Sequence, residues 1–166
     1  MTSKKANKLL LIGSSNGNAH IRNYYELIKD HFDEVLIVTN VPIDYCEHKI
    51  VGFGLKDPLK LFSSIKAVKA IIGTYQPDII HVHQSNVYGY VAAKANQGKH
   101  PLVLTTWGSD VLILPDTNFF NKYIVKTALK GANYITADAR FMGDKIQKLT
   151  GRTDTVIANF GIDISL

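Results

Sequence analysis

The chain has 166 residues, 46% hydrophobic and 20% charged, which is typical of one globular domain with a substantial core and excludes a disordered segment. Its single cysteine, Cys46, excludes an intrachain disulfide framework and a cysteine-rich metal site, and it suits a reducing compartment. The net charge of +5 comes from scattered basic residues, without the aromatic-interleaved stripe that would predict a nucleic-acid partner.

The N-terminal segment is basic, with Lys4, Lys5 and Lys8, but the apolar run behind it is too short for the core of a signal peptide. No stretch approaches the about 20 apolar residues that a membrane-spanning helix requires. We therefore expect a cytoplasmic protein. Its mild basic charge also allows peripheral contact with the anionic inner face of a membrane, although a solvated basic surface explains the same charge more simply.

Short apolar runs recur along the chain and are bounded by glycine, proline or polar residues. Continuous apolar runs of this kind are typical of buried strands in a parallel sheet. Such strands are expected at residues 9–12, 34–39, 50–53, 79–83, 102–106, 134–137 and 155–158.

Helical spacing of apolar residues separates these runs. Pro58 is expected to begin a long helix that ends near Tyr75, and Asp138 to cap the last helix. Other helices are predicted over residues 21–32, 88–96 and 118–130. The alternation predicts an open, doubly wound α/β domain, with a mainly parallel Rossmann-like sheet and helices on both faces.

In such a sheet a ligand lies beyond the carboxyl ends of the strands, near the point where the strand order reverses. This rule selects the loops after four of the expected strands, at residues 13–18, 83–86, 107–110 and 138–140. Within them, the expected substrate-binding residues are Gly13, Ser14, Ser15, Asn16, Gly17, His83, Trp107, Gly108, Ser109, Asp110, Asp138 and Arg140.

The first of these loops is small and polar. Gly13 and Gly17 would let the backbone approach a ligand, and the N–H groups of the following helix favour an anion such as a diphosphate. An ordinary strand-to-helix turn explains the same residues equally well. The G-x-G-x-x-G spacing is absent, and the second strand ends in Thr39 and Asn40 instead of the acidic residue that binds an NAD ribose. An NAD-dependent oxidoreductase is therefore disfavoured.

His81 and His83 alternate along one expected strand, so their side chains share a face. A His-x-His pair can bind zinc, but no third ligand is evident, and no metal site is expected. The common arrangement is one packed histidine and one near the site. His83, at the end of the strand, is the better functional candidate.

The loop at residues 107–110 combines an aromatic ring with polar groups. Gly108 allows backbone approach, Ser109 and Asp110 supply hydrogen-bonding groups, and Trp107 offers a face on which a sugar ring or a base can stack. The alternative is a turn followed by a helix N-cap, with Trp107 in the core. Local chemistry leaves both interpretations open.

Four segments, taken in order, carry a family resemblance. Residues 77–83 read PDIIHVH, residues 105–110 read TTWGSD, residues 132–137 read ANYITA and residues 157–163 read IANFGID. Together they resemble the N-terminal domain of glycosyltransferase family 4, the retaining GT-B enzymes. The resemblance covers almost the whole chain.

The resemblance implies an enzyme that transfers a sugar, with retention, from a nucleotide-sugar donor to a saccharide or lipid-linked acceptor in surface polysaccharide or glycolipid biosynthesis. Residues 1–166 would form the acceptor-side domain, whose partner is a C-terminal donor-binding domain beyond this chain. The main catalytic groups are expected in that second domain, which leaves Asp110 as a weak catalytic candidate here. The isolated chain is expected to be inactive, and no cofactor or metal is expected, because helix N-termini and basic side chains steady the diphosphate.

One position departs from the family. Many relatives have a histidine where Trp107 stands, and that histidine contacts the donor sugar. An indole donates but does not accept a hydrogen bond, so Trp107 is expected to act as a stacking wall. Two other functions stay open: half of a GT-B-shaped sugar-nucleotide epimerase or hydrolase, and a non-catalytic Rossmann-like binding domain.

Overall fold

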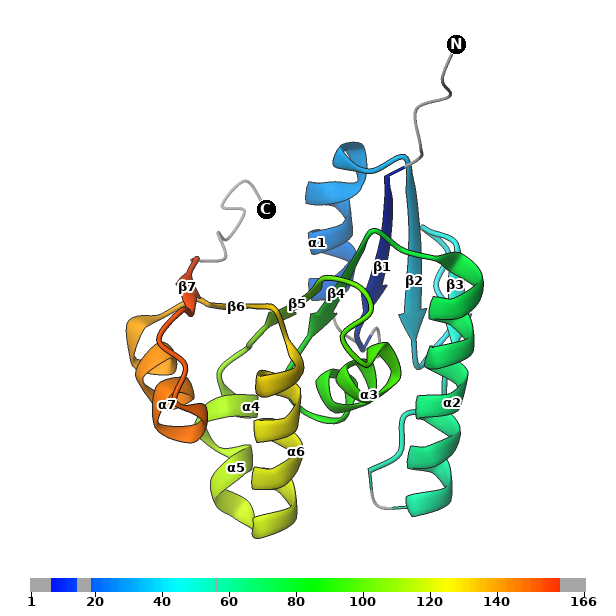
Figure 1. Cartoon of the computed structure of the whole chain (residues 1–166). Helices are drawn as coiled ribbons and strands as arrows, with labels where there is room; N and C mark the ends of the chain where they lie inside the picture. The colour runs from blue at the N-terminus through cyan, green and yellow to red at the C-terminus, as the bar shows by residue number, and fades with distance from the viewer. Residues whose placement is uncertain (1–6, 15–18, 56, 159–166) are drawn as a thin grey trace.

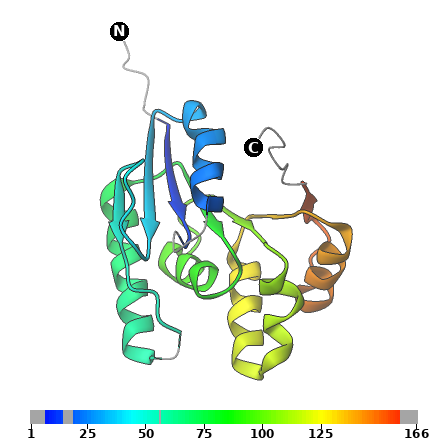
Figure 2. The same cartoon turned by 180° about the vertical axis from the view of Figure 1, so that it is seen from behind.

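A fully parallel sheet forms the centre of the computed structural model, which describes residues 7–14, 19–55 and 57–158 (Figures 1 and 2). Its strands lie in the order β3-β2-β1-β4-β5-β6-β7. Their bounds are β1 (Lys8–Ile12), β2 (Glu34–Thr39), β3 (His48–Ile50), β4 (Ile79–His83), β5 (Leu102–Thr105), β6 (Tyr134–Ala137) and β7 (Val156–Ile157). In the register of the central strands, Leu10 of β1 lies between Leu36 of β2 and Ile80 of β4.

Helices cover both faces of the sheet. Their bounds are α1 (Ala19–Ile28), the 3-10 turn η1 (Lys29–His31), α2 (Pro58–Tyr75), α3 (Val87–Asn96), α4 (Ser109–Leu112), α5 (Leu114–Thr117), α6 (Phe119–Gly131) and α7 (Arg140–Thr150). An apolar cluster lies on each face of the sheet, because alternate strand residues point to opposite sides. The larger cluster joins residues such as Leu10 and Val82 to α2, α3, α6 and α7. The smaller joins Leu11 and Ile37 to Ile21 of α1. The predicted doubly wound α/β fold is confirmed.

The strand order reverses between β1 and β4. The chain leaves β1 toward β2 on one side, and leaves β4 toward β5 on the other. The connections diverge there, so a crevice opens at the carboxyl ends of these two strands. Gly13 and Ser14 follow β1 at that edge, and Gln84 follows β4.

Close packing places α3 directly behind this edge. A Cβ on Gly89, in the first turn of α3, would lie 2.8 Å from the carbonyl oxygen of Gln84 and 3.0 Å from the Cβ of Ala128 on α6. A backbone oxygen cannot move aside as the tip of a flexible side chain can. The absence of a side chain at Gly89 therefore lets α3 and α6 pack against the loop that follows β4.

Three local predictions differ from the structure. The third strand is β3, His48–Ile50, and not residues 50–53; an edge strand pairs on one side only, and β3 carries no buried residue that would mark it. The first helix ends at Ile28 and continues as η1. Asp138 does not cap α7, because the extended N-cap residue is Ala139 and makes no side-chain cap bond. The short helices α4 and α5 were not predicted.

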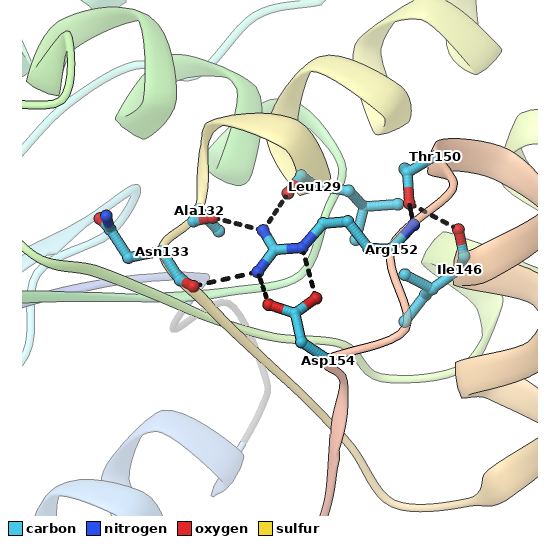
Figure 3. A network of polar contacts seen from close by, with 7 residues as sticks. All are labelled: Leu129, Ala132, Asn133, Ile146, Thr150, Arg152 and Asp154. Atoms are coloured by element: carbon cyan, nitrogen blue, oxygen red, sulfur yellow. Dashed lines mark hydrogen bonds and ion pairs between the residues drawn. The ribbon is translucent and has the colours of Figure 1, made fainter.

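Arg152 links the end of α6 to the segment that precedes β7 (Figure 3). Its guanidinium donates hydrogen bonds to the carbonyl oxygens of Leu129, Ala132 and Asn133, and it pairs with the Asp154 carboxylate. Carbonyls at the end of a helix have no partner within the helix. The side chain of Arg152 therefore supplies the donors that the last turn of α6 and the residues after it lack.

Replacing Arg152 with alanine should lower the free energy of unfolding by about 1–3 kcal/mol, because part-buried carbonyl groups lose their donors. The free energy of unfolding of Arg152→Lys should lie between those of the wild type and Arg152→Ala, since an ammonium cannot reproduce the planar fork of donors. Urea unfolding measures both effects. The exposed Lys148→Ala on α7 is the matched control. A stability equal to that of the control would contradict this role.

Candidate functional site

A narrow hollow of about 10 Å³ lies at the point where the strand order reverses. It is lined by Ser14, Ile21, His83, Gln84 and Trp107. These residues come from the loop after β1, from α1, and from the ends of β4 and β5. Three of the predicted binding residues therefore meet at one place, as the rule for parallel sheets requires.

Asp110 joins two of the loops that form the site. Its carboxylate is 3% exposed. One oxygen accepts from the backbone N–H of Trp107 at 2.9 Å, and the other accepts from the backbone N–H and the hydroxyl of Ser85 at 2.6 and 3.0 Å. Gly108, with φ of 102°, turns the chain between Trp107 and Asp110 in a conformation that favours glycine. Both oxygens of Asp110 thus hold the loops together, and its role in substrate contact or catalysis stays a prediction.

Trp107 determines which ring nitrogen of His83 carries the proton. The indole N–H donates to Nδ1 of His83 at 3.2 Å, and the two ring centroids lie 5.5 Å apart in an edge-on arrangement. An indole can only donate, so Nδ1 must accept, and the proton of the neutral imidazole must lie on Nε2. The half-buried Trp107 was expected to act as a stacking wall. The hydrogen bond gives it a second task, which is to fix one tautomer of a neighbouring histidine.

The Nε2 atom of His83 is a buried donor that lacks an acceptor. The side chain is 2% exposed, and within the described residues Nε2 has no hydrogen-bond partner. Burial lowers the pKa of His83 well below its usual value, with smaller contributions from His81 and His20, so the ring stays neutral. An unsatisfied buried donor costs about 1–3 kcal/mol. A ligand oxygen that reached Nε2 would satisfy it.

His81 is satisfied on both ring nitrogens. Nδ1 lies 2.7 Å from the hydroxyl of Tyr24, and Nε2 lies 2.7 Å from Oγ1 of Thr105, which in turn lies 2.8 Å from Oγ1 of Thr136. Burial raises the pKa of Tyr24 to about 12, so the phenol stays protonated and can donate to His81. Burial also lowers the pKa of His81 to about 4. His81 is thus the packed histidine of the pair, and His83 is the one at the site.

The other predicted residues divide into three groups. Gly13 is buried beside the site, and a Cβ there would overlap the end of Ile21. Ser109 and Gly108 lie at the start of α4, whereas Asp138 and Arg140 are exposed after β6 and are not among the residues that line the hollow. Ser15, Asn16 and Gly17 lie outside the described residues.

Tyr24, Gln84 and Ser85 belong to the site without having been singled out from the sequence. Ser85 lies in one of the selected loops, but its link to Asp110 spans 25 positions in the chain. Tyr24 lies on the buried side of α1, one turn from Ile21, and that spacing was the available signal. Its ring also stands edge-on to His83, with centroids 4.6 Å apart.

Metal ligands do not gather in the part of the chain that the structure describes: it contains no group of three or more His, Cys, Asp or Glu residues placed to hold an ion. Among the same residues, no helix is both long and apolar enough to span a membrane. Both nitrogens of His81 are engaged as described, so a zinc site on the His-x-His pair would have to break those bonds.

Removing the indole N–H should release the tautomer of His83. Wild-type His83 should be the Nε2–H tautomer at neutral pH, whereas Trp107→Phe, which keeps an aromatic ring but no donor, should give a mixture. The nitrogen NMR shifts of the imidazole ring distinguish the two forms. His81 provides the internal control, because Tyr24 and Thr105 hold it in either protein. An Nδ1–H tautomer in the wild type would rule out the proposed hydrogen bond.

Burial of neutral His81 should make the protein less stable in acid. The pKa of this group is 6.5 in the unfolded chain and about 4 in the folded one, so the unfolded chain binds more protons between these values. The free energy of unfolding should therefore fall as the pH is lowered from about 6.5 to about 4, by about 3 kcal/mol for this residue. Burial of His83 acts in the same direction.

Urea unfolding across this pH window measures the effect. His81→Asn has no titrating ring in this window and should therefore reduce the pH dependence. A full pH dependence in His81→Asn would mean that other groups cause it.

Solved structures share this fold at low sequence identity. HepE from Anabaena, in complex with UDP and glucose, is 16% identical with a TM-score of 0.72, over 96% of this chain and 46% of HepE. Sucrose-phosphate synthase from Thermosynechococcus elongatus is 16% identical with a TM-score of 0.73, over 96% and 49% of the two chains. UDP-GlcNAc 2-epimerase from Methanocaldococcus jannaschii is 11% identical with a TM-score of 0.68, over 90% and 45%. This chain therefore spans less than half the length of these three proteins.

The sequence comparison is more specific. No curated protein matches the chain significantly. The family model described as glycosyl transferase 4-like matches residues 8–139, which include β1 to β6 and the loops that follow them. The chain belongs to the glycosyl transferase 4-like family, and its Rossmann-like fold matches that of GT-B glycosyltransferases.

Proposed function

We propose that this chain is the acceptor-side, N-terminal domain of a retaining glycosyltransferase. The enzyme would transfer a sugar from a nucleotide-sugar donor to a saccharide or lipid-linked acceptor, in surface polysaccharide or glycolipid biosynthesis. One observation carries the proposal: a buried, neutral imidazole donor, which has no acceptor among the described residues, lies beside the hollow where the strand order reverses. Sugars are rich in neutral oxygen acceptors, and a neutral donor binds them without the cost of burying a charge.

The residues of this chain would bind and orient one substrate. His83 would donate from Nε2 to a sugar oxygen, while Trp107 keeps the ring in the required tautomer. Asp110 holds Trp107 and Ser85 in place, so the N–H group of His83 is positioned before the substrate arrives. Gly13 and Ser14 begin the loop that leads to α1, whose N-terminus would favour the phosphates of the donor.

A second Rossmann-like domain would supply the remaining parts. HepE and sucrose-phosphate synthase are each about twice as long as this chain, and the structure of HepE is of a complex with UDP and glucose. On that pattern the donor and the main catalytic groups would lie on the second domain, and transfer would occur in the cleft between the two. Helix N-termini and basic side chains would stabilise the leaving diphosphate without a metal ion.

An epimerase acting on a nucleotide sugar is the second candidate. UDP-GlcNAc 2-epimerases from Methanocaldococcus jannaschii and, as a putative enzyme, from Listeria monocytogenes share the fold with TM-scores of 0.68 and 0.69. An epimerase alters the nucleotide sugar itself and needs no acceptor, so the products distinguish the two functions. The family match favours the transferase.

The test compares two proteins: the 166-residue chain, and the chain extended by whatever coding sequence follows Leu166 in its gene. Both are given nucleotide sugars and a panel of saccharide and lipid-linked acceptors, and the products are identified by mass spectrometry. We expect the extended protein to form a glycosylated acceptor with retention, and the 166-residue chain to form none. Turnover by the shorter chain would overturn the two-domain requirement. A changed nucleotide sugar without acceptor product would favour the epimerase.

Variants of His83 connect this activity to the site. In the active protein, His83→Leu should lower kcat/KM by about 5- to 150-fold, the equivalent of one lost hydrogen bond from a buried donor. His83→Gln keeps an N–H donor and should retain more activity than His83→Leu. Equal activity in all three proteins would exclude His83 from substrate contact.

A further inference from the structure

Helix α6 presents two opposite faces. Its buried side consists of Ile124, Val125, Ala128 and Leu129, which pack toward the sheet. The opposite side carries residues that repeat every three or four positions and so form one stripe along the helix. These residues, which we call the α6 face, are Phe119, Lys122, Tyr123, Lys126 and Lys130. Together with Thr127 they line a hollow of about 480 Å³, much larger than the one at the strand ends.

The α6 face is strongly cationic. Its three lysines are spaced by four residues, and the sequence contains no Asp or Glu from Thr117 to Ala137. None of the ion pairs among the described residues involves these lysines. Tyr123 also contacts Tyr90 of α3, over which the Lys94 ammonium lies at 5.7 Å, so the positive charge continues onto the next helix. Helix α6 therefore brings three of the basic residues, which are four positions apart in the sequence, together on one surface.

Large apolar side chains adjoin these lysines. Phe119 is 86% exposed, and Phe120 and Tyr123 are about half exposed. Ile113, just before α5, is also exposed. Exposing rings of this size to water is unfavourable, and charge alone would not require them. A nucleic acid or an acidic protein would use the lysines, whereas a lipid bilayer uses both groups, with lysines at the headgroups and apolar rings among the acyl chains.

We propose that the α6 face, with Phe120, docks on an anionic lipid bilayer. Lys122, Lys126 and Lys130 would lie at the phosphate level, with their aliphatic stems over the apolar boundary, and Phe119 and Phe120 would insert. Because α6 connects two parallel strands, it runs opposite to them, and its first turn lies beyond the carboxyl ends of the strands, at the bottom of Figure 1. A bilayer held there would face those carboxyl ends. This docking surface does not depend on the sugar-transfer proposal.

Vesicle co-sedimentation of the 166-residue chain tests the surface. At low salt the chain should bind vesicles of phosphatidylcholine and phosphatidylglycerol, and should bind phosphatidylcholine alone far more weakly. K122Q/K126Q/K130Q should reduce the partition coefficient on the order of 100-fold, because each lysine contributes about fivefold near an anionic surface. The matched control is K60Q/K66Q/K69Q, which removes the same charge from exposed positions on α2 and should bind nearly as the wild type does.

The apolar part is tested separately. F119A/F120A should still bind at low salt but should dissociate at a lower salt concentration, since the rings supply the component that salt does not screen. Unchanged urea midpoints would show that the variants are folded. Equal losses in the two triple variants, or no wild-type binding at low salt, would overturn the proposal. So would binding of duplex DNA that depends on the α6 lysines when vesicles are not bound. Transfer to a soluble acceptor is measured without vesicles, so failure of either proposal is seen independently.

Discussion

The carboxylate of Asp110 is the interaction on which the candidate site depends. It is buried, and it accepts hydrogen bonds from two loops that follow different strands, through Ser85 and the backbone of Trp107. Hydrogen bonds to a charged acceptor are stronger than those between neutral groups. The position of Trp107 follows from this anchor, and the tautomer of His83 follows from Trp107. The buried carboxylate of Asp110 thus controls, through Trp107, which ring nitrogen of His83 carries the proton.

The face of the sheet next to α1 is polar at its centre, in contrast to the other face. There the side chains of His81, Thr105 and Thr136 point the same way from three neighbouring strands, and Tyr24 closes the row from α1. Each side chain donates a hydrogen bond to the next or accepts one from it, so the ring nitrogens of His81 and the hydroxyl groups of the row are buried with partners. His83, two residues after His81 on the same face, is the exception. This contrast between two histidines of one strand, together with the position of His83 at the strand end, is the reason we propose His83 and not His81 as a binding group.

Much of the fold could be predicted from the sequence because β1, β2 and β4 are buried on both faces and therefore read as continuous apolar runs. Where burial is weak the signal is lost, as at the edge strand β3 and in the four-residue helices α4 and α5. The loops of the site were also predictable, since they follow from strand order. The links between them were not: the contact of Asp110 with Ser85, and of Trp107 with His83, depends on which way side chains turn across a crevice. The lysine stripe of α6 was also predictable, because the lysines at positions 122, 126 and 130 are four residues apart and must share one side of a helix.

The orientation of His83 also determines what the hollow would reject. With Nδ1 occupied by the indole, the ring can offer a proton but cannot receive one. A hydroxyl or carbonyl oxygen meets that requirement, and a protonated amine does not, because it has no lone pair and would set one N–H against another. A histidine at position 107 could itself donate and accept hydrogen bonds. The tryptophan that stands there only donates, and by donating to Nδ1 it leaves His83 able to bind acceptors alone. If the proposed function holds, selectivity for a sugar hydroxyl over a protonated amine would then depend on Trp107, a residue that need not touch either group.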